Sequence, residues 1–104
     1  MGYSCSKAAD DTLKNIQANF RIKNSGNAFS NGSKTYFWEI GRENGDGAIT
    51  GKVWMDTGDQ FARSAGSFRI EADGTVVRFP GIPRKHWDWM KRMDEATRAR
   101  LNSL

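Results

Sequence analysis

Apolar residues recur at helical spacing near the start of the chain. Steps of four, three and four residues separate them, as on one side of an α-helix. These residues are Ala9, Leu13, Ile16 and Phe20. Ser6 precedes the stretch, and its hydroxyl suits the N-cap position of a helix. The pattern predicts a helix over about residues 6–21.

The next segment, residues 24–33, consists of Asn, Ser and Gly with Ala28 and Phe29 between them. This composition is typical of a loop, because these polar and small residues favour turns over regular structure. We expect residues 24–33 to be a mobile loop.

Beyond Lys34 the apolar period changes to two, which is the period of a β-strand. The alternating residues of this first hairpin are Tyr36, Trp38, Ile40, Ile49, Val53 and Met55. Between them lie the pairs Asn44-Gly45 and Asp46-Gly47, and either pair suits a two-residue hairpin turn. Both turns put the alternating set on one face of the sheet, which we expect to be the core face.

A second hairpin is predicted around Asp73-Gly74. Phe68 and Ile70 alternate before this pair, and Val77 and Phe79 follow it. A two-residue turn there sets Ile70 opposite Val77. Further from the turn, it sets Phe68 opposite Phe79, which extends the core face.

The segment Pro80-Gly81-Ile82-Pro83 ends the predicted sheet, because proline cannot donate a hydrogen bond to a ladder. Helical spacing then returns at Trp87, Met90, Thr97, Leu101 and Leu104. Asp94 suits an N-cap, so we expect this helix to break near residue 93. The prediction is a single α+β domain over residues 1–104, in which a four-stranded antiparallel meander is flanked by an N-terminal and a C-terminal helix (αββββα).

Length and composition narrow the classes of protein that fit. A chain of 104 residues suits one domain, and it has no run of about 20 apolar residues that would span a bilayer. It begins without the apolar stretch of a secretory signal, so we expect a cytoplasmic protein without membrane partners. One cysteine and one histidine leave no internal disulfide and no zinc quartet, and we expect no metal or cofactor.

Charge is distributed unevenly along the chain. Lys and Arg number 16 against 12 Asp and Glu, and residues 76–104 carry seven basic but only three acidic side chains. Residues 34–75 carry five basic and seven acidic side chains. A basic C-terminal end favours a polyanion or an acidic protein surface as partner, with a solvated helix that only maintains solubility as the alternative.

The sheet face opposite the core carries aromatic residues beside cations. The residues in question are Phe37, Lys52, Trp54, Arg63, Arg69 and Arg78. Arg69 falls opposite Arg78, and such a like-charge pair is unfavourable unless an anion lies between them. This composition is typical of a nucleic-acid platform, on which bases stack and cations neutralise phosphates. It equally suits a protein interface, or a solvated face on which Glu39 or Glu71 screens the arginines.

We therefore predict a non-catalytic binding protein. The first hypothesis is nucleic-acid binding through this face and the basic C-terminal helix, whose contributing cations are Arg84, Lys85, Lys91 and Arg92. The second is a protein-binding inhibitor or regulator of a host nucleic-acid-processing enzyme, as among small phage or mobile-element proteins.

Two further readings concern one pair of residues and one single residue. A patch of Phe37 and Trp54 also suits a homodimer. A hydrolase built on His86 is disfavoured, because Asp88 lies two residues along a helix and points away from it.

Overall fold

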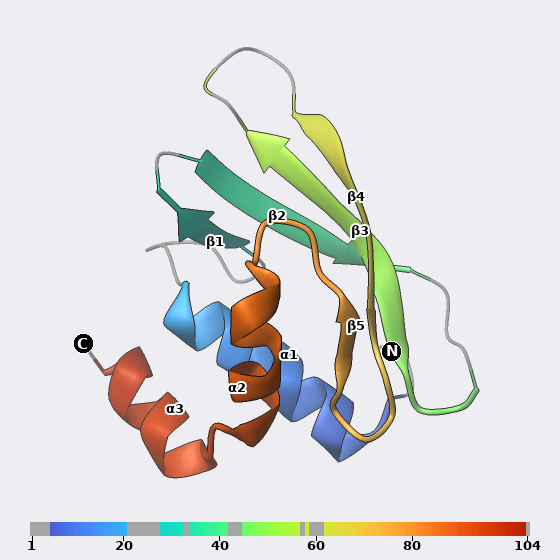
Figure 1. Cartoon of the computed structure of the whole chain (residues 1–104), viewed down its shortest axis with the longest axis vertical. Coiled ribbons are helices and arrows are strands. Elements are labelled where there is room, and N and C mark those ends of the chain that lie inside the picture. Colours follow the sequence, from blue (N-terminus) through green and yellow to red (C-terminus); the bar gives the residue numbers. More distant parts are fainter. Residues whose placement is uncertain are drawn as a thin grey trace.

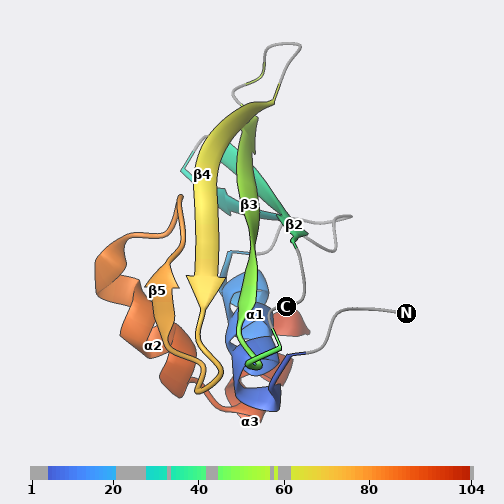
Figure 2. The same ribbon diagram turned by 90° about the vertical axis from the view of Figure 1, so that its right-hand side faces the viewer.

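The structure is a computed structural model that describes residues 5–20, 28–32, 34–41, 45–56, 58 and 62–103. Its elements are α1 (Lys7–Asn19), β1 (Ala28–Asn31), β2 (Lys34–Ile40), β3 (Ile49–Asp56), β4 (Arg63–Ile70), β5 (Val76–Arg78), the 3-10 turn η1 (Arg84–His86), α2 (Trp87–Arg92) and α3 (Glu95–Asn102). The strands form one antiparallel sheet in the order β1-β2-β3-β4-β5. The helices gather on one side of it (Figure 1), and the side of the sheet on which β4 is seen broadside in Figure 2 carries none. The predicted α+β class is confirmed.

Helix α1 begins where the sequence predicts. The Ser6 hydroxyl accepts a hydrogen bond from the Ala9 amide at 3.0 Å, as an N-cap does, and the helix buries the apolar side on which Ile16 lies. Two further contacts attach the first half of α1 to the hairpin loops. The Ser6 amide donates to the Gly47 carbonyl at 2.9 Å, and the Thr12 hydroxyl donates to the Gly74 carbonyl at 2.7 Å. The turns of both hairpins thereby fix the position of this helix.

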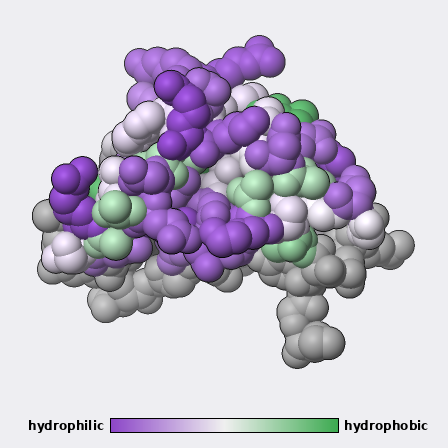
Figure 3. Space-filling view, turned by 90° about the horizontal axis from the view of Figure 1, so that it is seen from below, coloured by the Kyte–Doolittle hydropathy of each residue, from purple (hydrophilic) through white to green (hydrophobic). Residues whose placement is uncertain are grey.

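The predicted break in the C-terminal helix is also confirmed. Helix α2 ends at Arg92, and Asp94 caps α3 by accepting a hydrogen bond from the Thr97 amide at 2.8 Å. No residue of α3 is fully buried. The end of the molecule seen from below is mostly hydrophilic, with only small, separated apolar areas (Figure 3). Helix α3 is therefore not held in place by deep apolar burial.

A polar side chain on the buried side of α1 joins these helices. Asn15 is 1% exposed, and its Nδ2 donates to the Met90 carbonyl at 2.7 Å and to the Met93 carbonyl at 3.0 Å. These carbonyls lie at the end of α2, where helical carbonyls lose their partners within the helix. The Asn15 Oδ1 accepts a hydrogen bond from Arg98 of α3 at 3.3 Å. One buried amide thus connects α1, α2 and α3.

Strand β1 makes the sheet one strand larger than predicted. It lies inside the segment 24–33 that the composition assigned to a mobile loop, so that assignment is wrong for residues 28–31. Phe29 is fully buried, and its ring stacks on Tyr36 of β2 with centroids 5.0 Å apart. Two apolar residues suffice for an edge strand here, because β2 supplies the hydrogen-bonding partners and the core accepts the ring. Residues 24–27 and 33 of the predicted loop lie outside the described residues.

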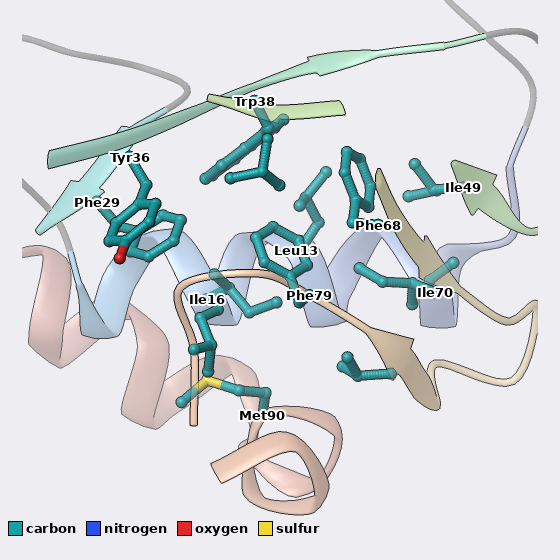
Figure 4. Close-up of a cluster of buried hydrophobic side chains, with 14 residues drawn as sticks. Leu13, Ile16, Phe29, Tyr36, Trp38, Ile49, Phe68, Ile70, Phe79 and Met90 are labelled. Atoms are coloured by element: carbon teal, nitrogen blue, oxygen red, sulfur yellow. The ribbon is translucent and has the colours of Figure 1, made fainter. Parts of the chain in front are cut away.

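The predicted core face of the sheet is confirmed for the first hairpin. Its buried residues are Tyr36, Trp38, Ile49 and Val53, and Ile40 and Met55 pack partly buried against them. The Phe79 ring packs 4.9 Å from Phe68 and 5.9 Å from Trp38, measured between centroids. Ile16 of α1 and Met90 of α2 cover the cluster from the helical side (Figure 4).

Gly51 makes room for one of these rings. It is the register partner of Phe68 in the adjacent strand. A Cβ at Gly51 would lie 2.6 Å from the Phe68 ring, too close for any side chain. The lack of a side chain at Gly51 in β3 therefore leaves room for the ring of Phe68 in β4.

The first hairpin turn is longer than predicted, yet the face assignment holds. The last register pair is Ile40 with Gly51, and the Gly41 amide donates to the Thr50 carbonyl at 2.8 Å, so the connection exceeds two residues. Arg42, Glu43 and Asn44 lie outside the described residues. The longer loop keeps the parity of the pairing, so the same side chains face the core.

The second hairpin differs from its prediction in two compensating ways. The Gly74 amide donates to the Glu71 carbonyl and the Glu71 amide to the Thr75 carbonyl, both at 2.8 Å, which closes a three-residue turn with Gly74 at φ 91°. Ile70 then pairs with Val76, and Val77 is the extra residue of a bulge. The core prediction for Val77 is wrong, because Val76 is buried and Val77 is 45% exposed.

The described helices include none with the length and apolar character needed to cross a membrane.

We expect Trp38→Ala to lower the free energy of unfolding by about 3–5 kcal/mol, because it opens a cavity among packed rings. Urea denaturation monitored by circular dichroism measures this. The matched control is Trp54→Ala on the opposite face of the sheet, which should cost about 1 kcal/mol or less. Equal losses for the two variants would contradict the face assignment.

We expect Asn15→Ala to lower the free energy of unfolding by about 2–3 kcal/mol, because it leaves two buried carbonyls without their side-chain donor and removes one of the acceptors of Arg98. The same denaturation experiment measures it. Lys14→Ala, on the exposed side of α1, is the control and should change stability little. If Asn15→Ala unfolds like the wild type, the amide does not join the helices in solution.

Candidate binding site on the open face of the sheet

The face of the sheet that points away from the helices brings together half of the ten side chains predicted to bind. These are Phe37, Lys52, Trp54, Arg69 and Arg78. The ladder pairs Phe37 with Trp54 and, at the other end of the face, Arg69 with Arg78. We refer to this surface as the open face. Its aromatic part (Phe37 and Trp54) and its arginine part (Arg69 and Arg78) lie at different positions along the strands.

The aromatic part lies on β2 and β3, near the middle of the sheet. Phe37 and Trp54 are cross-strand neighbours, and both are half-buried. The Trp54 indole nitrogen donates to Glu39 Oε1 at 3.2 Å, so its hydrogen-bonding requirement is met on the surface. Glu39 in turn pairs across the strands with Lys52. Two partly exposed aromatic side chains therefore lie beside a cross-strand pair of opposite charges.

The arginine part is a network of ion pairs. Arg69 Nε and Nη2 donate to the two carboxylate oxygens of Glu71 at 3.1 and 3.0 Å, and Nη2 also lies 3.3 Å from Asp46 Oδ2. Hydrogen bonding to Glu71 is the main cause that raises the pKa of the Arg69 guanidinium, and Asp46 adds to it. The two carboxylates offset the repulsion expected between Arg69 and Arg78. Glu71 thus screens the arginine pair, as expected from the alternative in which this face is solvated.

Asp46 connects this network to the loop between β2 and β3. Its carboxylate accepts a hydrogen bond from the Ala48 amide at 2.9 Å, and this bond is the main cause that lowers the pKa of Asp46. The hydrogen bond and charge of Arg69 lower the pKa of the carboxyl further. The arginine network therefore helps to hold the β2–β3 loop against the end of β4.

Arg63 does not belong to the open face. Strand β4 contains a bulge opposite Val53 and Trp54, after which Trp54 pairs with Ser64 and Met55 with Arg63. One extra residue reverses the alternation of side chains, so Arg63 shares the face of Met55 rather than that of Trp54. A bulge leaves no signature in the apolar period of this strand, whose first half is polar and small.

The four cations predicted on the C-terminal helix divide between two surfaces. Arg84 and Lys91 line a pocket beside β5, whereas Lys85 and Arg92 do not. Arg92 instead forms an ion pair with Asp88, one turn earlier, at 2.8 Å. The ten predicted residues therefore do not make one continuous surface.

The single histidine and the metal-ligating side chains were predicted to form no functional cluster. His86 is half-buried, and its ring lies edge-on to Phe20 with centroids 6.4 Å apart. Within the described ranges, no three His, Cys, Asp or Glu side chains converge to form a metal site. What the open face offers chemically is two aromatic side chains, hydrogen-bond donors and paired charges.

Sequence reasoning missed the role of Asp46 and the pocket formed by Thr75, Val76, Trp87 and Asp88 with the two cations. Glu71 was predicted as a residue that screens the arginines, and it lies two residues from Arg69, just beyond the end of β4. The position of Asp46 depends on a loop of unpredicted length. The pocket depends on how α2 packs against β5, which no local pattern encodes.

Comparison of the chain with protein-family models, with curated proteins and with solved structures gives no match. The function is therefore inferred from the geometry.

We expect the Asp46 carboxyl to titrate below its ordinary pKa in a carbon-detected NMR experiment. Because folding lowers this pKa, the charged carboxylate stabilises the fold above the ordinary pKa, and that contribution disappears as pH falls through the lowered value. Arg69→Gln should raise the Asp46 pKa part of the way back, since the Ala48 amide remains. Arg78→Gln is the control and should leave it near the wild-type value. An Asp46 pKa insensitive to Arg69→Gln would show that the ion pair does not form in solution.

Proposed function

We propose that this chain is a small non-catalytic binding protein whose open face docks on a single partner protein and thereby inhibits or regulates it. The observation that carries the proposal is the cross-strand pair Phe37 and Trp54 on an uncovered sheet face with balanced charge. Aromatic and arginine side chains supply most of the binding energy at protein interfaces, and charged residues fit around them.

The charge balance of the open face favours a protein over a polyanion. Lys52 faces Glu39 across the strands, and Arg69 is held by Glu71 and Asp46. A nucleic-acid backbone would approach these carboxylates at close range and would have to displace them from Arg69. A protein partner can instead present charges of both signs, which gives specificity without a net attraction.

Single-stranded nucleic acid is the second candidate partner. It is favoured by the same aromatic pair, because unpaired bases stack on exposed rings. Arg78 adds a cation that has no ion pair with the residues the structure describes. The two candidates differ in how binding responds to salt and to single substitutions.

We expect Trp54→Ala to weaken binding of the partner protein by about 30-fold or more, as the loss of a central interface residue does. The protein, immobilised through its C-terminus, is exposed to nuclease-treated lysate, the retained partner is purified, and its dissociation constant is measured by calorimetry. Trp89→Ala is the matched control, because Trp89 is a 43% exposed tryptophan of α2 that lies off the open face. It should bind like the wild type.

Other outcomes of this experiment would assign a different partner, or none, to the open face. Nucleic acid is the partner instead if material is retained only from lysate without nuclease treatment, and if oligothymidylate binding weakens steeply as the salt concentration rises. Concentration-dependent self-association lost in Trp54→Ala indicates a homodimer. If Trp54→Ala and Trp89→Ala bind alike, the open face is not the interface.

A further inference from the structure

A pocket of about 230 Å³ lies between β5 and the start of the C-terminal helical segment. Its lining residues come from β5 and its preceding turn, from η1 and from α2, and they are Thr75, Val76, Arg84, Trp87, Asp88 and Lys91. Val76 is buried and Trp87 is half-buried, so an apolar wall lies behind the charged groups. The Trp87 indole donates to the Ile82 carbonyl at 3.0 Å, which fixes the orientation of the ring. The pocket therefore has a preformed apolar side.

Two cations reach this pocket from different elements. Lys91 Nζ donates to the Thr75 hydroxyl at 2.9 Å and lies 3.6 Å from Asp73, which positions the ammonium group without using all three of its donors. The Arg84 guanidinium lies over the Trp87 ring, 5.5 Å from its centroid. The Arg84 guanidinium has no hydrogen bond or ion pair with any residue that the structure describes. Its five N–H donors are therefore available to a ligand.

The acidic residue of the lining does not cancel these charges. Asp88 Oδ2 forms an ion pair with Arg92 Nε at 2.8 Å, and Arg92 lies outside the pocket lining. The charge of Asp88 is thereby compensated by a cation on its own helix. With Asp88 paired to Arg92 and Lys91 paired to Asp73, the group keeps the positive charge of Arg84 beside an apolar wall. Ligand pockets typically combine such apolar area with a few polar or charged groups that fix the ligand's orientation.

We propose that this pocket binds a phosphoryl group, with the organic part of the ligand against Trp87 and Val76. A phosphomonoester has three terminal oxygens and up to two negative charges, which match the fork of donors on Arg84 and the point charge of Lys91. A water molecule takes about 30 Å³, so a pocket of this volume accepts more than a bare phosphate. The site contains no open-face residue and is independent of the function proposed above.

Two sources could supply the phosphoryl group. One is a small phosphomonoester, and the other is the phosphodiester backbone of a single-stranded nucleic acid. Phenyl phosphate represents the first source, because it joins a phosphoryl group to a flat ring. Oligothymidylate without terminal phosphates represents the second.

The experiment is an NMR titration of the full chain, observing the Trp87 indole N–H and the Arg84 Nε–H. Phenyl phosphate should shift both signals saturably, with a dissociation constant of about 1 mM or lower. Inorganic phosphate should shift the Arg84 signal more weakly. If oligothymidylate shifts the same signals with a lower dissociation constant than phenyl phosphate, the backbone of a nucleic acid is the source. If it does not, a small phosphomonoester is the source.

Three variants distinguish phosphate binding in the pocket from non-specific electrostatic attraction of phosphate to a basic protein. Arg84→Gln and Lys91→Gln should each weaken phenyl phosphate binding by about tenfold or more, because each removes hydrogen bonds to a charged group. Lys85→Gln removes the same charge from the neighbouring position outside the pocket and should have less than about a twofold effect. Signals of the core tryptophan Trp38 report that every variant remains folded. The proposal is overturned if no phosphate probe saturates the signals, or if all three variants weaken binding equally.

Discussion

The side-chain amide of Asn15 is the interaction on which the helical layer depends. It lies on the buried side of α1, donates to two carbonyls at the end of α2, and accepts from Arg98 of α3. An amide is suited to this position because it can donate and accept at the same time. The position of α2 in turn sets how Met90 covers the core and how Trp87 faces β5. The pocket beside β5 thus depends on a residue that does not contact it.

Much of the architecture follows from the period of apolar residues. The core face of β2 and β3, the N-cap at Ser6 and the helix break before Asp94 were all predictable, because each rests on a local rule. Strand β1 was not, since its two apolar residues lie in a segment of loop-like composition. Whether such a pair forms a strand depends on a free edge and on space in the core, which are properties of the assembled sheet.

The candidate site was only partly predictable for a related reason. Pairing of Arg69 with Arg78 was correct, although the turn is three residues long, because the bulge at Val77 restores the register. The bulge in β4 has no such compensation, and it moves Arg63 to the other face. Ion pairs that involve loops, such as that of Arg69 with Asp46, depend on loop lengths that apolar patterning leaves open. Alternation therefore predicts faces well only as far as the first bulge.

Helix α3 is attached to the molecule in an unusual way for a terminal helix. It has no fully buried residue, and its links to α1 are the pairs of Lys7 with Glu95 and of Arg98 with Asp11, together with the hydrogen bond from Arg98 to Asn15. Attraction between exposed charges is screened over about 10 Å at 0.1 M salt, whereas apolar burial is not weakened by salt in this way. Salt therefore weakens the exposed pair of Lys7 with Glu95 more than the contacts of Arg98, whose side chain is only 14% exposed. Helix α3 is thus retained chiefly by one arginine side chain, which reaches both a carboxylate of α1 and the buried amide of Asn15.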